Sequence, residues 1–208
     1  MVQFSAKRLP FGQPPAGPEV IDDDGTGLPT PARVRLRLRR QAGIAEAREI
    51  LAHLPEPGES VHAIMTARMD LSDVLHCLLD RLGRCERMTI STLSYNERNL
   101  KHMLSWIDAK TVGSLTLLAS IFFRSHKIPL WEATRAAFTE RGQRCACAHS
   151  HAKTCTLLFA NGTKLAIEGS ANLCSNGSGR EQIALVNDPG LHDFHAGWVE
   201  GMVAKAEG

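Results

Sequence analysis

The chain has 208 residues, of which 43% are hydrophobic and 22% charged. This composition fits one domain with an apolar core. Its 24 lysines and arginines nearly balance its 22 aspartates and glutamates, so a net charge of +2 excludes a strongly acidic or basic field over the whole molecule. No apolar run of about 18 residues or more occurs, which excludes a transmembrane helix, and no signal peptide is recognisable. We therefore expect a cytoplasmic protein whose six cysteines are free thiols.

The first part of the chain is rich in proline and glycine. We predict that residues 1–32 form an extended or disordered arm and that residues 33–208 form one domain. Arginines then alternate with apolar residues, which predicts a strand with a basic face formed by Arg33, Arg35, Arg37 and Arg39. Such a face would bind a nucleic-acid backbone. The alternative is a solvated edge strand whose charges prevent aggregation.

Residues 44–54 predict a short helix that ends before Pro55, and strand and helix patterns alternate from residue 60 onward. Asp70 or Ser72 would cap the first of these helices, and Ser94 and Glu97 would form a capping box for the next. The patterns predict strands over residues 61–66, 88–93, 114–123 and 182–187, and helices over 71–82, 94–107, 129–141 and 191–204. The last helix has an apolar stripe of Leu191, Phe194, Trp198 and Met202, which we expect to be buried. This alternation predicts an α/β fold, a mixed β-sheet flanked by helices on both faces.

The segment from His151 to Glu181 is the most informative part of the chain. Its central Asn161-Gly162 pair predicts a tight hairpin turn. With a two-residue turn, His151 would face Asn172 and Lys153 would face Ser170, at about 5 Å across the hairpin. Four side chains able to bind phosphate would then lie on one patch.

His151-x-Lys153, followed by Gly169-Ser170-x-Asn172, resembles the phospholipase D superfamily, and Glu181 resembles its downstream acidic residue. The resemblance implies the fold of that family and phosphodiester hydrolysis without a metal or other cofactor. It implies that His151 is the nucleophile, that Lys153 and Asn172 hold phosphate oxygens with support from Ser170, and that Glu181 fixes the tautomer of His151. Leu158 stands where the family usually has an aspartate, and the hairpin is longer than usual.

The family uses two such motifs in each active site, whereas this chain has one and no internal repeat. The resemblance therefore implies a homodimer in which a second copy of His151 acts as the acid. A two-fold axis brings identical residues together, so this arrangement is geometrically available.

Cys145, Cys147, His149 and His151 suggest a zinc site by residue type. On one strand, however, the outer pair would lie about 20 Å apart, too far for one tetrahedral zinc ion. We expect no metal site, and we expect His149, which shares the face of the motif, to assist substrate binding. His126 and Lys127 follow the buried strand 114–123 and would line the same cleft or form a surface turn.

The resemblance implies a phosphodiesterase, and the small size and single motif favour a nuclease. Two alternatives stay open. One is a noncatalytic nucleic-acid-binding or scaffold protein that keeps the phosphate pocket. The other is a hydrolase of phospholipid headgroups.

Overall fold

The computed structural model describes residues 31–207 except residue 67 and residues 175–178, with the backbone alone described for 31–40 and 207. The predicted arm over residues 1–32 lies almost entirely outside this part and stays a prediction. The strands are β1 (Ser60–Met65), β2 (Cys85–Thr92), β3 (Val112–Ser120), β4 (Arg144–Ala148), β5 (Thr154–Phe159), β6 (Lys164–Gly169) and β7 (Glu181–Val186). The helices are α1 (Pro31–Ile50), α2 (Leu71–Leu82), α3 (Glu97–Asp108), α4 (Ile121–His126), α5 (Ile128–Glu140) and α6 (Pro189–Glu207).

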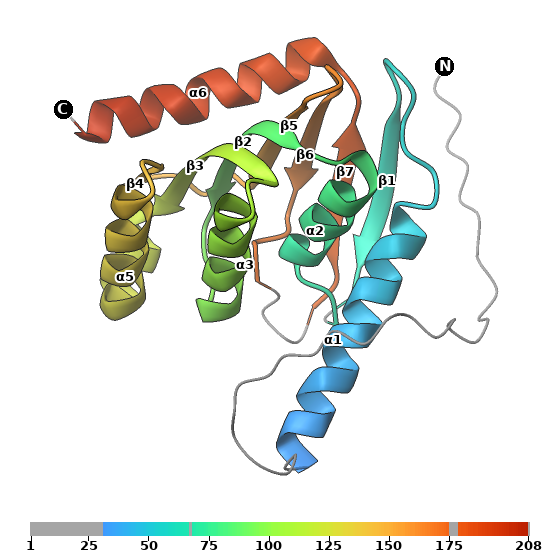
Figure 1. The fold of residues 1–208 in the computed structure, drawn as a ribbon, viewed down its shortest axis with the longest axis horizontal. Coiled ribbons are helices and arrows are strands. Elements are labelled where there is room, and N and C mark those ends of the chain that lie inside the picture. The colour runs from blue at the N-terminus through green and yellow to red at the C-terminus, as the bar shows by residue number, and fades with distance from the viewer. Residues whose placement is uncertain (1–30, 67, 175–178, 208) are drawn as a thin grey trace.

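The strands of the described residues form one sheet in the order β1-β7-β6-β5-β2-β3-β4 (Figure 1). Strands β2, β3 and β4 run parallel, and the other neighbours pair antiparallel. The sheet is therefore mixed, as the sequence predicts.

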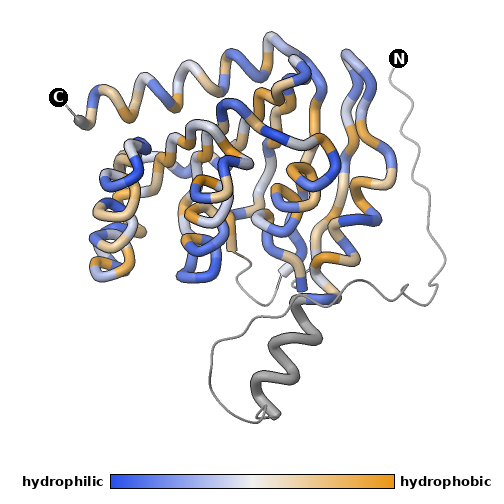
Figure 2. The backbone as a smooth tube through the Cα atoms, in the orientation of Figure 1, coloured by the Kyte–Doolittle hydropathy of each residue, from blue (hydrophilic) through white to orange (hydrophobic). Residues whose placement is uncertain are grey.

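Helices cover both faces of the sheet. On β3, Leu117 packs into the core cluster shared with α1, α2, α3 and α5, whereas the next residue, Leu118, packs against Val199 and Val203 of α6. Successive residues of a strand point to opposite faces, so α6 lies on the face opposite α1, α2, α3 and α5. Figure 2 shows hydrophobic residues along the strands. The helices in the same view carry both hydrophobic and hydrophilic residues. The predicted α/β class with helices on both faces is confirmed.

Capping residues set the beginnings of α2 and α3. Asp70 precedes α2, and its backbone N–H donates to the Asp73 carboxylate at 2.9 Å, as in a capping box. The predicted capping box of Ser94 and Glu97 is wrong. Asn96 caps α3 instead and accepts from the Asn99 N–H at 3.1 Å, because an Asn side chain caps as well as a serine hydroxyl.

The predicted strand over residues 33–39 is wrong, because these residues lie in α1. Pro31 suits the first position of a helix, and arginine and leucine are good helix formers. Tertiary packing also favours the helix, since Ala47 is buried in the core and Ile44 packs against it. The side chains of Arg33, Arg35, Arg37 and Arg39 lie outside the described residues, so their contact with nucleic acid stays a prediction.

The predicted strand over residues 114–123 extends too far. Strand β3 ends at Ser120, whose hydroxyl accepts from the Phe122 N–H at 3.1 Å and caps α4. A local side-chain bond of this kind competes with the strand ladder.

The predicted buried stripe of α6 is wrong at Phe194, which is 65% exposed. The buried residues include His192, His195, Val199 and Val203. His195 is buried with partners on both ring nitrogens, because Nε2 lies 3.0 Å from Glu168 Oε2 and Trp198 Nε1 donates to Nδ1 at 3.0 Å. A buried imidazole needs such partners, and its polar character hides it from an apolar pattern.

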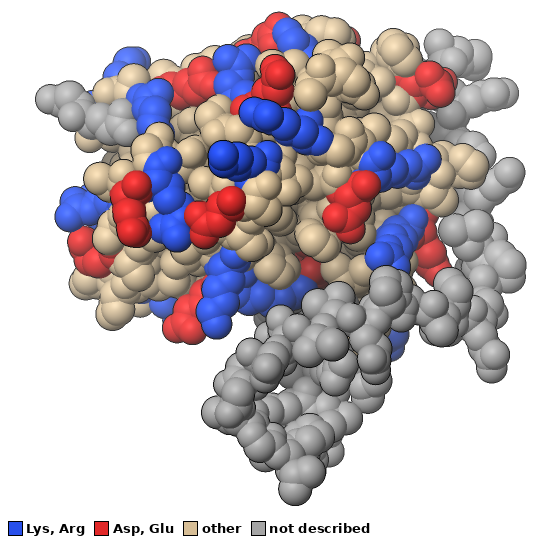
Figure 3. Space-filling view, viewed as in Figure 1, with Lys and Arg blue, Asp and Glu red and all other residues tan. Residues whose placement is uncertain are grey.

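Among the described residues, none of the helices is long and apolar enough to span a membrane. On the face seen in Figure 3, basic and acidic side chains lie beside one another. This mixture agrees with the small net charge of +2.

Candidate functional site

The candidate residues gather where the strands end at the bottom of the sheet in Figure 1. We call this row of strand ends the site edge. The pairing directions place the carboxyl ends of β2, β3, β4 and β6 at this edge, together with the beginnings of β5 and β7. The imidazole segment, residues 149–153, connects β4 to β5 here. The amide loop, residues 170–174, leaves β6 at the same edge.

The predicted register of the hairpin is wrong by one residue. Thr154 pairs with Glu168 and Leu158 with Lys164, so partner numbers sum to 322 rather than 323. The loop holds three residues, 160–162, because the Phe159 N–H donates to the Thr163 carbonyl and Gly162 adopts a φ of +86°. A three-residue loop with glycine in the left-handed conformation is the next common alternative to a two-residue turn. The pairing also stops at Thr154, so His151 and Lys153 lie beyond the strand.

His151 and Lys153 contact each other within the imidazole segment. Lys153 Nζ lies 3.1 Å from His151 Nδ1 and donates to the His151 carbonyl at 3.0 Å. An ammonium can only donate, so Nδ1 accepts, and a neutral ring then has its proton on Nε2. His151 is exposed and Lys153 is half-buried. Burial lowers the pKa of Lys153 below its usual value, and the nearby Glu181 charge opposes that change.

Ser170 and Glu181 form a second pair. The Ser170 hydroxyl donates to Glu181 Oε2 and accepts from the Gln182 N–H at 3.0 Å. The Ser170 N–H also donates to the Gln182 carbonyl at 2.9 Å. Glu181 therefore holds the serine and acts on Lys153 through its charge. Its hydrogen bond to His151 stays a prediction.

Asn172 is buried, and its Oδ1 accepts from the Leu93 N–H at 3.1 Å. The next residue, Leu173, donates its N–H to the Thr92 hydroxyl at 3.2 Å. The amide loop is thus attached to the end of β2. With Oδ1 occupied by the backbone, the Nδ2 group of Asn172 remains as the donor suited to an anion.

The end of β2 supports the imidazole segment as well. The Ser91 hydroxyl donates to the Ala152 carbonyl at 3.1 Å, and the Ala152 N–H donates to the Ser150 hydroxyl at 3.2 Å. Sequence reasoning missed this role of Ser91, Thr92 and Leu93. The available signal was a pair of hydroxyl residues at the end of an otherwise apolar strand.

A buried network lies beneath the amide loop. Asn99 Nδ2 donates to the Leu173 carbonyl at 3.3 Å and to the Ser72 hydroxyl at 2.9 Å. Its neighbour Arg98 forms ion pairs with Asp70, at 3.2 Å, and with Asp73. Burial raises the pKa of Asp73, and the Arg98 charge opposes this rise. Helices α2 and α3 are thereby joined to each other and to the loop that holds Asn172.

The other predicted residues lie in different positions. His149 is exposed at the bend after β4, and β4 is three strand spacings, about 14 Å, from β5. Leu158 is half-buried near the far end of β5 and pairs with Arg87 and Lys164. The described residues contain no group of three or more His, Cys, Asp or Glu placed to hold a metal. Burial raises the pKa of Cys147 to about 12, so this thiol stays protonated at neutral pH.

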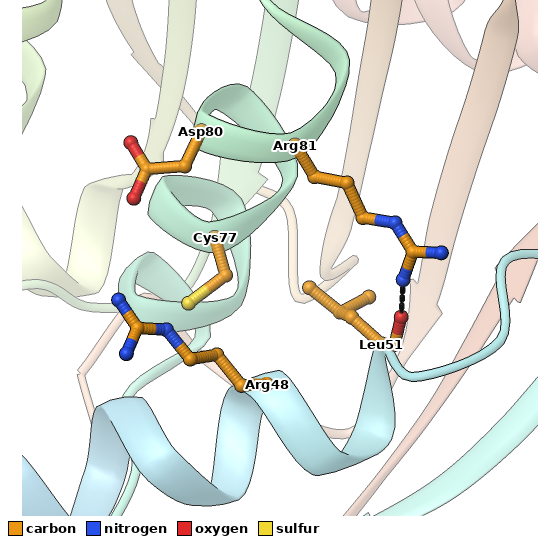
Figure 4. Close-up of a pocket in the computed structure, with 5 residues that line it drawn as sticks. All are labelled: Arg48, Leu51, Cys77, Asp80 and Arg81. Carbon is orange, nitrogen blue, oxygen red and sulfur yellow. Dashed lines mark hydrogen bonds between the residues drawn. The ribbon is translucent and has the colours of Figure 1, made fainter. Parts of the chain in front are cut away.

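A separate cavity of about 210 Å³ lies between α1 and α2 (Figure 4). It is lined by Arg48, Leu51, Cys77, Asp80 and Arg81. Arg81 donates to the carbonyls of Leu51 and, at 3.2 Å, of Ala52, so it caps the end of α1. Burial raises the pKa of Cys77 to about 11. This cavity is at the carboxyl end of α2, away from the site edge, and its groups serve the packing of α1.

No protein-family model matches the sequence, and no curated protein is similar to it. Solved structures of the phospholipase D family are similar to the chain. Nuc from Salmonella typhimurium, a phospholipase D family member, has a TM-score of 0.49 and 12% identity, over 71% of this chain and 96% of Nuc. NucT from Helicobacter pylori has a TM-score of 0.45 and 11% identity, over 71% of this chain and 98% of NucT.

The archaeal chromatin protein TrmBL2 has a TM-score of 0.49 and 8% identity, over 84% of this chain and 64% of TrmBL2. At such identities and TM-scores, these similarities carry no argument about the reaction. The functional proposal therefore rests on this chain's own residues.

Proposed function

We propose that the chain is a metal-independent phosphodiesterase that cleaves nucleic acid through a phosphohistidine on His151. The observation that supports it best is the contact of His151 Nδ1 with Lys153 Nζ at 3.1 Å, at the edge that also holds Asn172 and the Ser170–Glu181 pair. A phosphodiester site needs a nucleophile and positive donors beside it. Here the exposed His151 is the nucleophile, and the half-buried Lys153 beside it is the positive donor.

The first step forms a bond from His151 Nε2 to phosphorus and breaks the bond from phosphorus to the leaving oxygen, which takes a proton from an acid. In the free protein the ring proton is on Nε2, because Nδ1 accepts from Lys153. Attack therefore requires Lys153 to move from Nδ1 to a phosphate oxygen, so that Nδ1 carries the proton. Substrate binding would drive this exchange, since an ammonium binds an anion more strongly than a neutral ring nitrogen.

In the second step, water attacks the phosphorus of the phosphohistidine and the phosphorus–nitrogen bond breaks. The water loses one proton to the base that the acid became in the first step, and the product phosphate leaves. Asn172 Nδ2 and Lys153 hold the nonbridging oxygens through both steps. Glu181 keeps Ser170 in place and sustains the charge of Lys153.

The acid is proposed to be His151 of the partner subunit. One chain offers one His-x-Lys motif, and a two-fold contact at the site edge would complete the pocket. Sedimentation of the full chain should show a dimer. Mixed dimers of parent and His151→Ala subunits should be inactive, so activity should fall with the square of the parent fraction. A linear fall would contradict a shared site.

The direct test is cleavage of labelled DNA in EDTA, followed by a quench in denaturant. We expect cleavage and an acid-labile adduct on His151, both lost in His151→Ala. His53→Ala is the matched control, since it removes an exposed imidazole outside the imidazole segment, and it should form the adduct. A requirement for added Mg²⁺ would exclude the histidine mechanism.

The competing function is noncatalytic nucleic-acid binding. It is favoured by Leu158, which stands at the position of the family's aspartate. DNA retention without cleavage or adduct would support it. Cleavage of phospholipid headgroups in place of DNA would support the lipid hydrolase.

A further inference from the structure

An exposed aromatic pair stands at the site edge, on the short helix α4. Phe122 is 60% exposed, and its ring lies 4.1 Å from the ring of His126, centroid to centroid, with 34° between the planes. His126 Nδ1 lies 2.8 Å from the Phe122 carbonyl and 3.1 Å from the Ser125 hydroxyl. The imidazole is therefore held against the phenyl ring before any ligand binds.

Position connects this pair to the proposed site. Strand β3 ends at Ser120, which pairs with Ala148, and the imidazole segment begins at the next residue, His149. Helix α4 follows Ser120 directly, so it leaves the sheet beside that segment. Burial raises the pKa of Cys174 in the amide loop, and the Ser94 hydrogen bond and, more weakly, the charge of Lys127 oppose the rise.

The charged side chains on and just after α4 are all basic. Residues 121–131 include Arg124 and Lys127 but no aspartate or glutamate. Residues 124–129 are all exposed. A two-fold contact of this surface with its own copy would set like charges against each other, which disfavours dimerisation through it. Exposed aromatic rings beside basic side chains are the features that bind single-stranded nucleic acid, through base stacking and phosphate contacts.

We propose that Phe122 and His126, flanked by Arg124 and Lys127, form a stacking platform that receives an unpaired base next to the phosphate in the proposed site. The inference rests on the proposed function for its substrate class and adds strand preference to it. In a duplex, the base faces are covered by stacking on their neighbours and are not available to Phe122. Single strands should therefore bind more tightly than duplexes of the same sequence.

The test measures binding alone, with the full-length His151→Ala protein, which cannot turn over substrate. Affinities are measured by fluorescence anisotropy for one oligonucleotide, single-stranded and as a duplex. Phe122→Ala should weaken single-strand binding by about tenfold, as expected for the loss of one stacked base, and should leave duplex binding unchanged. Phe122→Trp should retain the affinity. A 2-aminopurine base in the single strand should be quenched by the His151→Ala protein and not by the same protein carrying Phe122→Ala.

Phe194→Ala is the matched control. Phe194 is 65% exposed on α6 and also lies against a histidine ring, at 5.2 Å from His195, so the same change there should leave single-strand binding intact. Equal effects of Phe122→Ala on both substrates, or none on either, would overturn the platform. Dissociation of a dimer by Phe122→Ala would instead assign the surface to a contact between copies, and would also overturn it.

The two proposals fail separately. Absence of metal-independent cleavage, together with single-strand binding that depends on Phe122, would refute the reaction and support the platform. Cleavage that depends on His151, together with unchanged binding by Phe122→Ala, would refute the platform and leave the reaction.

Discussion

The imidazole segment and the amide loop meet at the same edge of the sheet, but different contacts support them. His151 is exposed, and its segment is attached by hydrogen bonds of Ser91 and Ser150 to Ala152. Asn172 is buried, and a network of buried polar groups on α2 and α3 lies beneath its loop. Changes to the first half should therefore affect chemistry, and changes beneath the second should affect stability.

The largest effect on stability should come from Arg98→Met. This change leaves the buried Asp73 without its ion pair, and removing one partner of a buried pair costs about 3 kcal/mol. The measurement is urea unfolding, with Arg135→Met as control. Arg135 pairs with Glu132 on the surface, so its loss should cost less than about 0.5 kcal/mol. Equal costs would remove the contrast between buried and exposed pairs.

The pH dependence of the same variant has a definite sign. Burial raises the pKa of Asp73 above its usual 3.8, so the folded state holds the proton more tightly than the unfolded state, and stability falls as the pH rises through that window. Arg98 limits this fall. The deficit of Arg98→Met should thus be larger at neutral pH than below pH 3.8.

Lys153→Met tests the other half of the comparison. Removing one positive donor from the proposed phosphate site should lower kcat/KM for DNA cleavage by about 100-fold, with no change in the unfolding midpoint. Lys164→Met is the control, because Lys164 forms an ion pair with Asp193 at 2.7 Å and pairs with Leu158 at the end of the β5–β6 ladder opposite the site edge. A fall in stability with unchanged cleavage would show that Lys153 is structural.

Asn99→Ala should have a smaller effect on stability. It removes the donors to the Leu173 carbonyl and the Ser72 hydroxyl, and unsatisfied buried groups cost about 1–3 kcal/mol. Cleavage should also fall, because the loop that holds Asn172 loses support. Ser105→Ala, on the exposed side of α3, should change neither quantity. An Asn99→Ala protein of normal stability would contradict the proposed anchoring.

The smallest effect should be a pH shift in Glu181→Gln. Burial lowers the pKa of Lys153 below 10.5, and the Glu181 charge opposes this. The alkaline limb of the pH–rate profile should move to lower pH in the variant, because Lys153 then loses its proton sooner. Glu168→Gln is the control, since Glu168 bonds His195 on α6. A shift to higher pH would show that Glu181 acts on Lys153 in another way.

The sequence predicted the fold where the pattern was unambiguous. The leucines of α2 repeat at helical spacing and end at Gly83, so the predicted bounds of 71–82 agree with the structure. The arginine alternation before residue 40 also has a period of two, but α1 packs through its later half, at Ile44 and Ala47, and a helix results. Local alternation cannot reveal that distant packing.

The sequence indicated which residues belong to the candidate site better than it indicated how they are arranged. Asn161-Gly162 correctly predicted a hairpin, but the dipeptide does not fix the loop length, and a three-residue loop moved the register by one. The support from Ser91 and Asn99 depends on contacts between distant segments, at 61 and 74 residues of separation along the chain. Such contacts leave no short-range pattern, so the anchoring of the amide loop could not be predicted.

The turn at residues 160–162 has a practical consequence. Its three residues are exposed, and the six residues of β5 separate it from the imidazole segment by about 20 Å. A fluorophore or a short affinity tag inserted beside Asn161 would extend into solvent at the end of the strands opposite the site edge. Labelled protein could then report DNA capture or immobilise the molecule while the opposite edge stays open.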